Sequence, residues 1–287
     1  MIKDQIAVEK MARLREILRK LTSVVVAYSG GVDSTFLMWV AADELGNSAL
    51  AVTARSETYP EWESREAASI AERFEFRSRI VETSELAIPN FRNNPPERCY
   101  YCKSELFETL LRIAAEEGLR HVAVGATVSD CSDYRPGHKA ARELGVVSPL
   151  LDAGLTKEEI RVLSRKVGLP TWNKPEFACL ASRFPYYEEI TEVKLSRVAK
   201  AEDFLRSLGI RQFRVRHHGN MARIEVDVEI IEMIMTVKRK KIARHFRSLG
   251  FDHVAVDLEG YRQGSLNASL KDSPEGKIQP VMVDIQK

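Results

Sequence analysis

The chain of 287 residues has only four cysteines and no long apolar run. Its longest apolar stretches, such as residues 24–28, are far shorter than the roughly 20 residues that a helix needs to cross a bilayer. Residues 1–5 include an acidic side chain, and no apolar segment follows them, so we expect no signal peptide. Without such a leader, the cysteines indicate thiols, metal ligands or catalytic groups before they indicate disulfides. We therefore expect a cytoplasmic protein with no membrane association.

The sequence also lacks an excess of charge of one sign. Lys and Arg number 43 and Asp and Glu number 41, which gives a net charge of +2, so bulk charge does not indicate a nucleic-acid or membrane partner. There are 15 Gly and 11 Pro, both ordinary numbers, and we find no repeat and no low-complexity tract. This excludes a fibrous or largely disordered protein. With 44% apolar residues, the chain is long enough for one large domain or two modest ones.

The order of expected elements in the first half of the chain indicates an α/β fold. Short apolar runs predict the strands, and segments with helical periodicity lie between them. This alternation predicts a doubly wound parallel sheet with helices on both faces and with the active site along the edge where the strands end. The expected strands are residues 23–28, 50–53, 76–81 and 121–124, and the expected helices are residues 5–21, 36–45, 61–74 and 104–117.

The pattern changes in the second half. Thr156 and Glu159 form a capping box that begins a helix. Residues 168–187 have little periodicity and predict a loop, of a length that is usually functional. The expected elements after it are helix 191–208, strand 212–217, strand 222–227, helix 229–248 and strand 253–257. This order predicts a smaller α+β domain, and we expect domains at residues 1–185 and 186–287.

A glycine-rich hexapeptide follows the first expected strand. Its glycines allow positive φ and a close approach to an anion, and the helix behind it offers unpaired N–H groups and the positive end of its dipole. Ser29 and Ser34 add hydroxyl donors. Asp33 cannot meet a phosphate without a cation between them, which indicates either Mg²⁺ or an N-cap role. A glycine-rich turn without a ligand is the alternative. The hexapeptide is Ser29, Gly30, Gly31, Val32, Asp33 and Ser34.

The cysteines fall into two groups. Cys99 and Cys102 lie just before an expected helix, where two thiols can share a metal, form a disulfide or simply pack. Cys131 is expected to be an ordinary, partly buried residue. Cys179 lies in the long loop close to Arg183, whose guanidinium favours a thiolate and can also hold a phosphate. Spacing alone leaves both a catalytic and a structural role open for Cys179.

These motifs resemble those of known proteins. The hexapeptide resembles the signature of the PP-loop ATP pyrophosphatases, and the chain from about residue 15 to 270 resembles the LarE family of ATP-dependent sacrificial sulfur transferases. That family helps to make the nickel-pincer nucleotide cofactor of lactate racemase. The hexapeptide is shared by many PP-loop enzymes, whereas the other motifs together are specific to the family. They lie at residues 98–103, 133–137, 178–183 and 214–218.

The resemblance implies a reaction in three steps with ATP and Mg²⁺ as cofactors. A carboxylate of pyridinium-3,5-biscarboxylic acid mononucleotide is adenylated, and pyrophosphate leaves. Cys179 then attacks the acyl-adenylate and expels AMP. Removal of the cysteine Cα–H and cleavage of the Cβ–S bond leave a thiocarboxylate on the substrate and dehydroalanine in the protein. Each chain donates one sulfur.

The resemblance also implies contacts to ATP. The whole hexapeptide holds the nucleotide, with Ser29, Asp33 and Ser34 expected to serve the adenylation and Asp33 to bind Mg²⁺. Thr53 is expected near the adenine, and Gly125 is expected to contact ATP. Residues 125–130 depart from the family pattern Gly-Thr-Asn-x-Asp-Asp, so that Asp130 and Asp133 are the carboxylates that remain for Mg²⁺ and ribose.

Contacts to the second substrate are expected on both halves of the chain. Arg214 and Arg216 alternate on an expected strand, so they project from one face and can grip one phosphate. Tyr100 or Tyr101 can stack on the pyridinium ring. The expected substrate-binding residues are Tyr100, Lys103, Arg183, Arg214 and Arg216, and the candidate bases for the elimination are Lys103, Glu202 and Glu225.

Three other functions remain open. Cys99, Cys102 and Cys179 could hold a [4Fe–4S] cluster for catalytic sulfur transfer. The basic run at residues 238–241, with Arg244 and Arg247, could track a tRNA backbone in a tRNA thiolase, although we expect no nucleic-acid partner. The chain could also bind ATP as a regulator without turning it over. The resemblance implies a homo-oligomer and other proteins of the cofactor pathway as partners.

Overall fold

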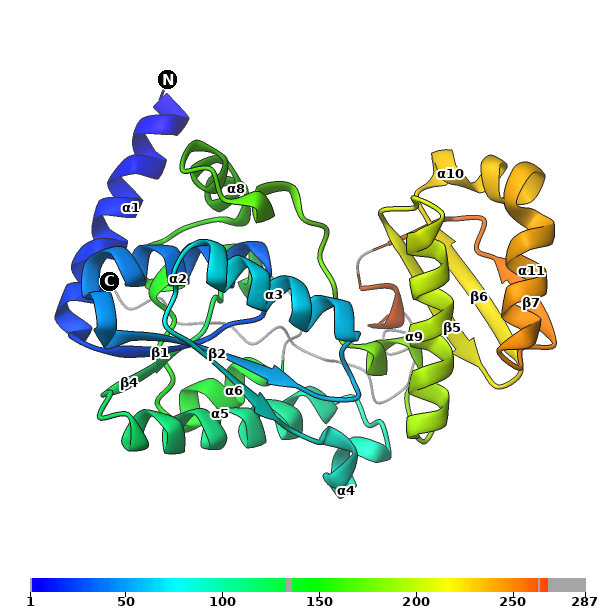
Figure 1. Ribbon diagram of the computed structural model, residues 1–287, viewed down its shortest axis with the longest axis horizontal. Helices are drawn as coiled ribbons and strands as arrows, with labels where there is room; N and C mark the ends of the chain where they lie inside the picture. The colour runs from blue at the N-terminus through cyan, green and yellow to red at the C-terminus, as the bar shows by residue number, and fades with distance from the viewer. Residues whose placement is uncertain (1, 133–135, 263, 268–287) are drawn as a thin grey trace. The chain divides into compact units, whose positions relative to one another are not determined.

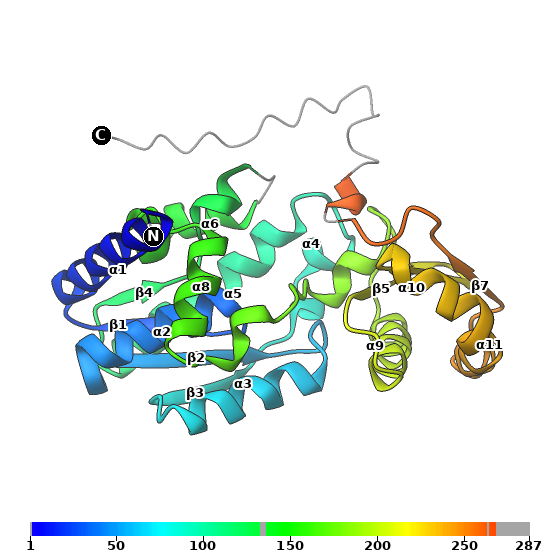
Figure 2. The same cartoon turned by 90° about the horizontal axis from the view of Figure 1, so that it is seen from above.

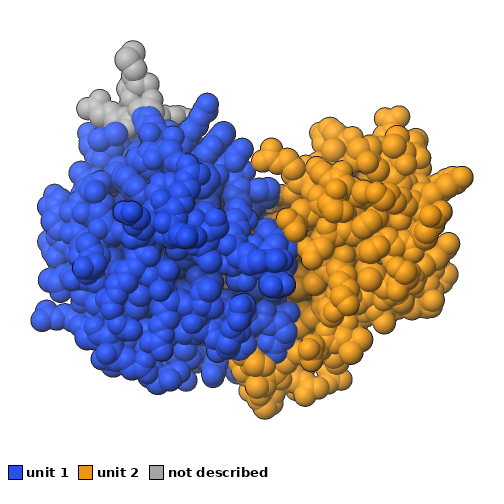
Figure 3. All heavy atoms as spheres, in the orientation of Figure 1, with its two compact units in different colours: residues 1–83, 97–176, 279–287 blue, residues 84–96, 177–278 orange. Residues whose placement is uncertain are grey.

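The computed structural model describes residues 2–132, 136–262 and 264–267. Contacts divide the chain into two units, which Figure 3 colours differently. The described part of unit 1 comprises residues 2–83 and 97–176 apart from residues 133–135, and that of unit 2 comprises residues 84–96 and 177–267 apart from residue 263. The expected domain boundary at residue 185 stays a prediction, since contacts alone do not test independent folding. Asp133 and most of the expected 133–137 motif lie outside the described residues.

The sheet of unit 1 confirms the expected parallel α/β fold. Its strands are all parallel and lie in the order β3-β2-β1-β4, so that the first strand is central (Figure 1). In the register, Val24 of β1 is paired with Ala49 of β2 and with His121 of β4. The strands are β1 (Val24–Ala27), β2 (Ala49–Arg55), β3 (Ser78–Glu82) and β4 (His121–Ala123).

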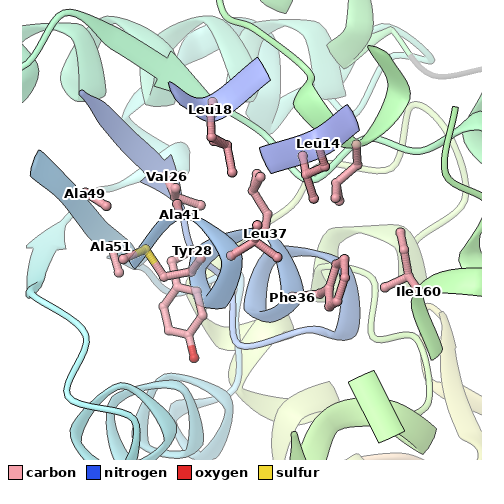
Figure 4. Close-up of a cluster of buried hydrophobic side chains, with 14 of the residues drawn as sticks. Leu14, Leu18, Val26, Tyr28, Phe36, Leu37, Ala41, Ala49, Ala51 and Ile160 are labelled. Carbon is pink, nitrogen blue, oxygen red and sulfur yellow. The ribbon is translucent and has the colours of Figure 1, made fainter. Parts of the chain in front are cut away.

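Helices cover both faces of this sheet, because the side chains of β1 alternate between two apolar clusters. Val26 faces α1, α2 and α8, where Leu14, Phe36 and Ile160 pack against it and its neighbours (Figure 4). Val25 faces the opposite way, toward a cluster that includes α5 and α6. The helices of unit 1 are α1 (Ile2–Leu21), α2 (Val32–Leu45), α3 (Glu61–Arg73), α5 (Arg98–Glu116), α6 (Gly137–Glu143), α7 (Pro149–Asp152) and α8 (Lys157–Lys166).

Two of these helices begin earlier than the sequence predicted. α2 begins at Val32 rather than at residue 36, since the second half of the hexapeptide forms its first turn. α5 begins at Arg98 rather than at residue 104, so the expectation that Cys99 and Cys102 precede the helix was wrong. The capping box of Thr156 and Glu159 is confirmed in both of its hydrogen bonds.

Unit 2 contains the smaller α+β structure that the sequence predicted. In its sheet, β5 (Phe213–His218) is antiparallel to β6 (Met221–Val226), which is parallel to β7 (His253–Val256). The helices α9 (Glu192–Ser207) and α11 (Arg239–Ser248) lie on one face of this sheet (Figures 1 and 2). A short helix, α4 (Pro89–Arg92), also belongs to unit 2.

Two segments of the chain's second half differ from the expectation. The expected regular helix at residues 229–248 is interrupted, because a π-helical turn at Ile234–Lys238 lies between α10 (Val228–Met233) and α11. The expected loop at residues 168–187 contains two 3₁₀ turns, Pro170–Asn173 and Leu180–Arg183. Among the described residues, no helix combines the length and the apolar character that a membrane span requires.

Candidate active site

The hexapeptide of residues 29–34 connects β1 to α2 and is fixed by its own side chains. Gly30 has a φ of +67°, and a Cβ at this position would lie 2.7 Å from the Cβ of Ala67. The hydroxyl oxygens of Ser29 and Ser34 are 3.1 Å apart, and Ser34 Oγ also accepts a hydrogen bond from the backbone N–H of Ser29 at 3.2 Å. The position of Gly30 therefore requires glycine, and the hydrogen bonds between Ser29 and Ser34 hold the loop in a closed turn.

The N-terminus of α2 lacks a side-chain cap. Gly31 is the N-cap residue, and its carbonyl accepts the N–H of Thr35 at 3.0 Å. Asp33 lies within the first turn, so the alternative that Asp33 is the N-cap was wrong. Unpaired N–H groups and the positive end of the helix dipole make such a terminus suitable for an anion.

Gly125, an expected ATP contact, follows β4 and comes close to this terminus. A Cβ on Gly125 would lie 3.0 Å from the backbone nitrogen of Ser34. Thr53, the other expected contact, is buried in β2 and aligned with Ile80 of β3. The structure thus brings Gly125 to the hexapeptide and places Thr53 two residues before the end of β2.

Asp33 carries an unusual carboxyl group. Burial raises its pKa to about 6, and the charge of Asp130 adds to the rise. Lys157 opposes it, with Nζ 3.4 Å from Oδ2 of Asp33. The other oxygen, Oδ1, is buried and receives no hydrogen bond from the described residues. Because an uncompensated buried carboxylate oxygen is costly, this position favours an additional cation.

Magnesium fits this carboxylate. Mg²⁺ usually keeps several waters and binds one or two carboxylates together with substrate phosphates. Asp33 supplies an oxygen to which no described residue donates a hydrogen bond, and Asp130 supplies a second carboxylate whose Oδ2 accepts hydrogen bonds from Thr127. Within the described ranges, no group of three or more His, Cys, Asp or Glu side chains is arranged to hold a metal ion. The residues therefore suit a cation that protein and phosphate hold together.

Two lysines at the hexapeptide were missed by the sequence analysis. Lys157 Nζ lies 2.5 Å from Glu176 Oε1 as well as near Asp33. Lys174 Nζ donates to the carbonyl of Gly30 at 3.1 Å and pairs with Glu66 at 3.1 Å. The sequence itself carried a signal for Lys157. A lysine directly after an N-cap residue places a positive charge at the positive end of the helix dipole, which does not stabilise the helix and so indicates another role for the side chain.

Cys179 lies in unit 2 and is half-buried, and Arg183 holds the backbone around it. The guanidinium of Arg183 donates to the carbonyls of Ala178 at 3.0 Å and of Cys179 at 3.3 Å. Cys179 is the residue before the 3₁₀ turn, and its carbonyl also accepts the N–H of Ser182 at 3.0 Å. Arg183 was expected to favour a thiolate or to hold a phosphate. In the structure it is fully buried and fixes the turn that carries the thiol.

Two buried ion pairs surround this turn. Arg183 binds Glu202 of α9 at 2.8 and 2.9 Å. Arg216 of β5 binds Glu225 of β6 at 2.9 and 2.8 Å, and its Nη1 donates to the carbonyl of Ser182 at 2.7 Å. Glu202 and Glu225 were candidate bases, and the structure engages both oxygens of each carboxylate with an arginine.

Arg214 is the third guanidinium of this group. Its guanidinium lies over the rings of Phe177 and Tyr261, at 5.0 and 5.1 Å. Burial, followed by the nearby charge of Arg183, lowers its pKa to about 10. Arg214 thus lies near the charges of Arg183, Arg216 and Glu202. Guanidinium groups gathered in this way suit an anion.

The remaining expected residues lie at the start of α5 in unit 1. Tyr100 donates its hydroxyl to Glu143 at 2.6 Å, and the ammonium of Lys139 lies 5.1 Å from its ring centre. Lys103 packs against Gly137, where a Cβ would lie 2.8 Å from Lys103 Cγ. Cys99 is exposed and Cys102 is half-buried, and both are thiols in unit 1. Cys131 lies in a segment whose side chains are not described.

Comparison with known proteins identifies the family. The chain is 38% identical to the pyridinium-3,5-bisthiocarboxylic acid mononucleotide synthase of Lactiplantibacillus plantarum over 262 residues, which are 91% of this chain and 95% of the synthase. The chain belongs to the LarE family. The expected family membership is therefore confirmed.

Two further relatives match nearly their whole length. An uncharacterised protein of Synechocystis is 45% identical over 91% of this chain and 98% of its own. An uncharacterised protein of Methanocaldococcus jannaschii is 28% identical over 88% of this chain and 98% of its own. No family model matches the chain. This member of the LarE family is thus similar to its relatives across both units and not in the hexapeptide alone.

Proposed function

We propose that this LarE-family chain is an ATP-dependent sulfur transferase that converts pyridinium-3,5-biscarboxylic acid mononucleotide toward its bisthiocarboxylic form, for a nickel-pincer cofactor. The observation that carries the proposal is the 38% identity across 95% of a synthase named for that product. A cytoplasmic homo-oligomer that works with other proteins of the cofactor pathway is part of the same proposal.

The first step assigned to unit 1 is adenylation of a substrate carboxylate. The uncapped terminus of α2 and the two serines bind the pyrophosphate of ATP, with Gly125 at the same place. Asp33 and Asp130 would hold Mg²⁺, which would neutralise phosphate charge and make pyrophosphate a better leaving group. The carboxylate attacks the α-phosphorus, the bond to pyrophosphate breaks, and an acyl-adenylate forms.

The second and third steps use Cys179. Its sulfur attacks the acyl carbon, AMP leaves, and a thioester joins substrate and protein. A base removes the Cα–H of Cys179, and the electron pair forms the Cα=Cβ bond while the Cβ–S bond breaks. The sulfur departs on the substrate as thiocarboxylate, and the protein keeps dehydroalanine. Arg183 supports both steps as a positioning residue, because it holds the carbonyls on either side of the Cys179 Cα.

The substrate's own phosphate is assigned to the arginine cluster of unit 2. The guanidinium of Arg214 lies over two aromatic rings and close to the charges of Arg183 and Arg216. A planar guanidinium held in this way can bind a phosphate, with Arg216 beside it.

The proposal is tested by comparing Cys179→Ala with Cys99→Ala. Each variant is incubated with MgATP and the biscarboxylate nucleotide, and pyrophosphate and thiocarboxylate are measured separately. We expect Cys179→Ala to release pyrophosphate but to deliver no sulfur, and Cys99→Ala to do both. Thiocarboxylate from Cys179→Ala would disprove the donor. Loss of product in both variants would instead favour a cluster that uses Cys99.

A further inference from the structure

The lysines Lys157 and Lys174 connect the hexapeptide to the chain segment that leads to Cys179. Lys157 is the first residue of α8, and its ammonium lies between Asp33 of α2 and Glu176. Lys174 donates to the carbonyl of Gly30 within the hexapeptide. Glu176 is the last residue of this stretch of unit 1 and precedes Cys179 by three residues. The end of the segment is therefore held at the hexapeptide by two side chains.

The charges at this place are poorly suited to an incoming polyphosphate. Three carboxylates, those of Asp33, Glu66 and Glu176, face two ammonium groups. Both lysine side chains are more than four-fifths buried, with 17% and 12% of their surface exposed. A polyphosphate bound at α2 would be repelled by these carboxylates at short range in a partly buried site. The repulsion falls if Mg²⁺ compensates Asp33 and the other two carboxylates move away.

A polyphosphate bound at α2 would compete with these carboxylates for the two lysines. The ammonium of Lys157 lies between two carboxylates, at 3.4 Å from Asp33 and 2.5 Å from Glu176, and so pairs with both. A polyphosphate carries several negative charges where a carboxylate carries one, and it accepts charge-assisted hydrogen bonds from ammonium groups. Glu66 and Glu176 are partly exposed, at 45% and 38%, and can be hydrated once they are released.

We infer that Lys157 and Lys174 are positioning residues shared between the pyrophosphate group of ATP and the Cys179 segment. Before nucleotide binds, they hold Glu176 and the Gly30 carbonyl and so restrain the start of that segment. When the pyrophosphate group binds, it takes over the two ammonium groups, and the Glu176 restraint is released. ATP binding and freedom of the Cys179 segment are thereby linked, which ties sulfur delivery to adenylation. This inference rests on the proposed function, since it takes the hexapeptide to be the ATP site.

The inference predicts opposite effects for the two partners of each ion pair. Lys157→Met and Lys174→Met remove a donor to the anion and weaken its binding. Glu176→Gln and Glu66→Gln release a lysine for the anion and tighten its binding, each by about two- to fivefold. A purely structural role would weaken binding in all four variants. Glu158→Gln and Lys166→Met, on exposed positions of the same helix, are matched controls that leave the affinity unchanged.

The test is calorimetric titration of the full chain and its variants with inorganic pyrophosphate and Mg²⁺. Tighter binding by Glu176→Gln together with weaker binding by Lys157→Met supports the inference. Unchanged or weaker binding by Glu176→Gln, with normal binding by the wild type, overturns it and leaves the proposed function intact. No binding by the wild type would instead contradict the assignment of the ATP site. Amide exchange in residues 174–179, without ligand, is expected to be faster in Glu176→Gln than in Glu158→Gln, and equal rates would also overturn it.

Discussion

Arg183 and Glu202 form a buried ion pair with two parallel hydrogen bonds, at 2.8 and 2.9 Å, beside the turn that carries Cys179. Arg183 is fully buried and Glu202 is 2% exposed. The same guanidinium binds the carbonyls of Ala178 and Cys179. One side chain thus links helix α9 of unit 2 to the backbone of the proposed sulfur donor.

Arg183→Met should lower the free energy of unfolding by about 3–5 kcal/mol, because it leaves the charge of Glu202 buried without a partner. The double variant Arg183→Met, Glu202→Met should recover much of this loss, since it removes both charges. Urea unfolding of the single and double variants measures the difference. A double variant as unstable as Arg183→Met would show that the pair is not the source of the loss. Sulfur transfer should stay low in the double variant, because the carbonyls of Ala178 and Cys179 no longer accept hydrogen bonds from a guanidinium group.

Asp33→Asn should stabilise the ligand-free protein at neutral pH. The pKa of Asp33 is raised from 3.8 to about 6, so the folded state binds the proton more tightly than the unfolded state. The protonated side chain therefore favours the folded state fully below pH 3.8. This stabilisation is lost as the pH rises through about 6, so the free energy of unfolding is about 3 kcal/mol lower above that range. Urea unfolding between pH 4 and pH 8 should show a smaller fall of stability with pH in the variant. An equal fall in both proteins would contradict the burial argument, and Mg²⁺-dependent pyrophosphate release should be lost in the variant.

Arg214→Gln should raise KM for the biscarboxylate nucleotide by roughly 10- to 100-fold, the loss expected for a hydrogen bond between charged groups. The control is the same substrate without its phosphate, for which the variant and the wild type should differ little. Arg214→Lys should rescue only in part, since lysine lacks the planar group that stacks between Phe177 and Tyr261. Equal losses with both substrates would show that Arg214 does not contact the phosphate.

Gly30→Ala should disturb the hexapeptide far more than Gly145→Ala. Both glycines have a φ of +67°, so an alanine at either position destabilises the fold by about 1–2 kcal/mol of backbone strain. A Cβ at Gly30 would lie 2.7 Å from the Cβ of Ala67, whereas a Cβ at Gly145 meets no atom of the described residues within 4 Å. The unfolding temperature should therefore fall further in Gly30→Ala than in Gly145→Ala, and pyrophosphate binding should be impaired only in Gly30→Ala. Equal effects would argue that the close approach to Ala67 relaxes without cost.

The fold could be predicted largely from local patterns. The apolar run that became β1 is buried on both faces, and the capping box of Thr156 and Glu159 begins α8 as expected. The start of α5 was missed because Cys99 and Tyr100 give no helical signal by themselves. The π-helical turn was missed because residues 234–238 continue the same periodicity as their neighbours.

The candidate site was predictable where its residues are adjacent in sequence and much less so where they are not. The hexapeptide was recognisable because six consecutive residues carry its chemistry. The partners of Arg183 and Arg216 were not, since Glu202 and Glu225 come from other elements and a sequence does not state which strand face meets which helix. Lys157 was missed for the same reason, because its partner Asp33 lies 124 positions before it in the chain.

Mass spectrometry can show whether the chain gives up the sulfur of Cys179. The protein is incubated with MgATP and the biscarboxylate nucleotide and then analysed intact and after digestion. We expect the loss of one H₂S from the peptide that contains Cys179, with at most one sulfur delivered per chain. An unchanged Cys179 peptide together with thiolated product would contradict it.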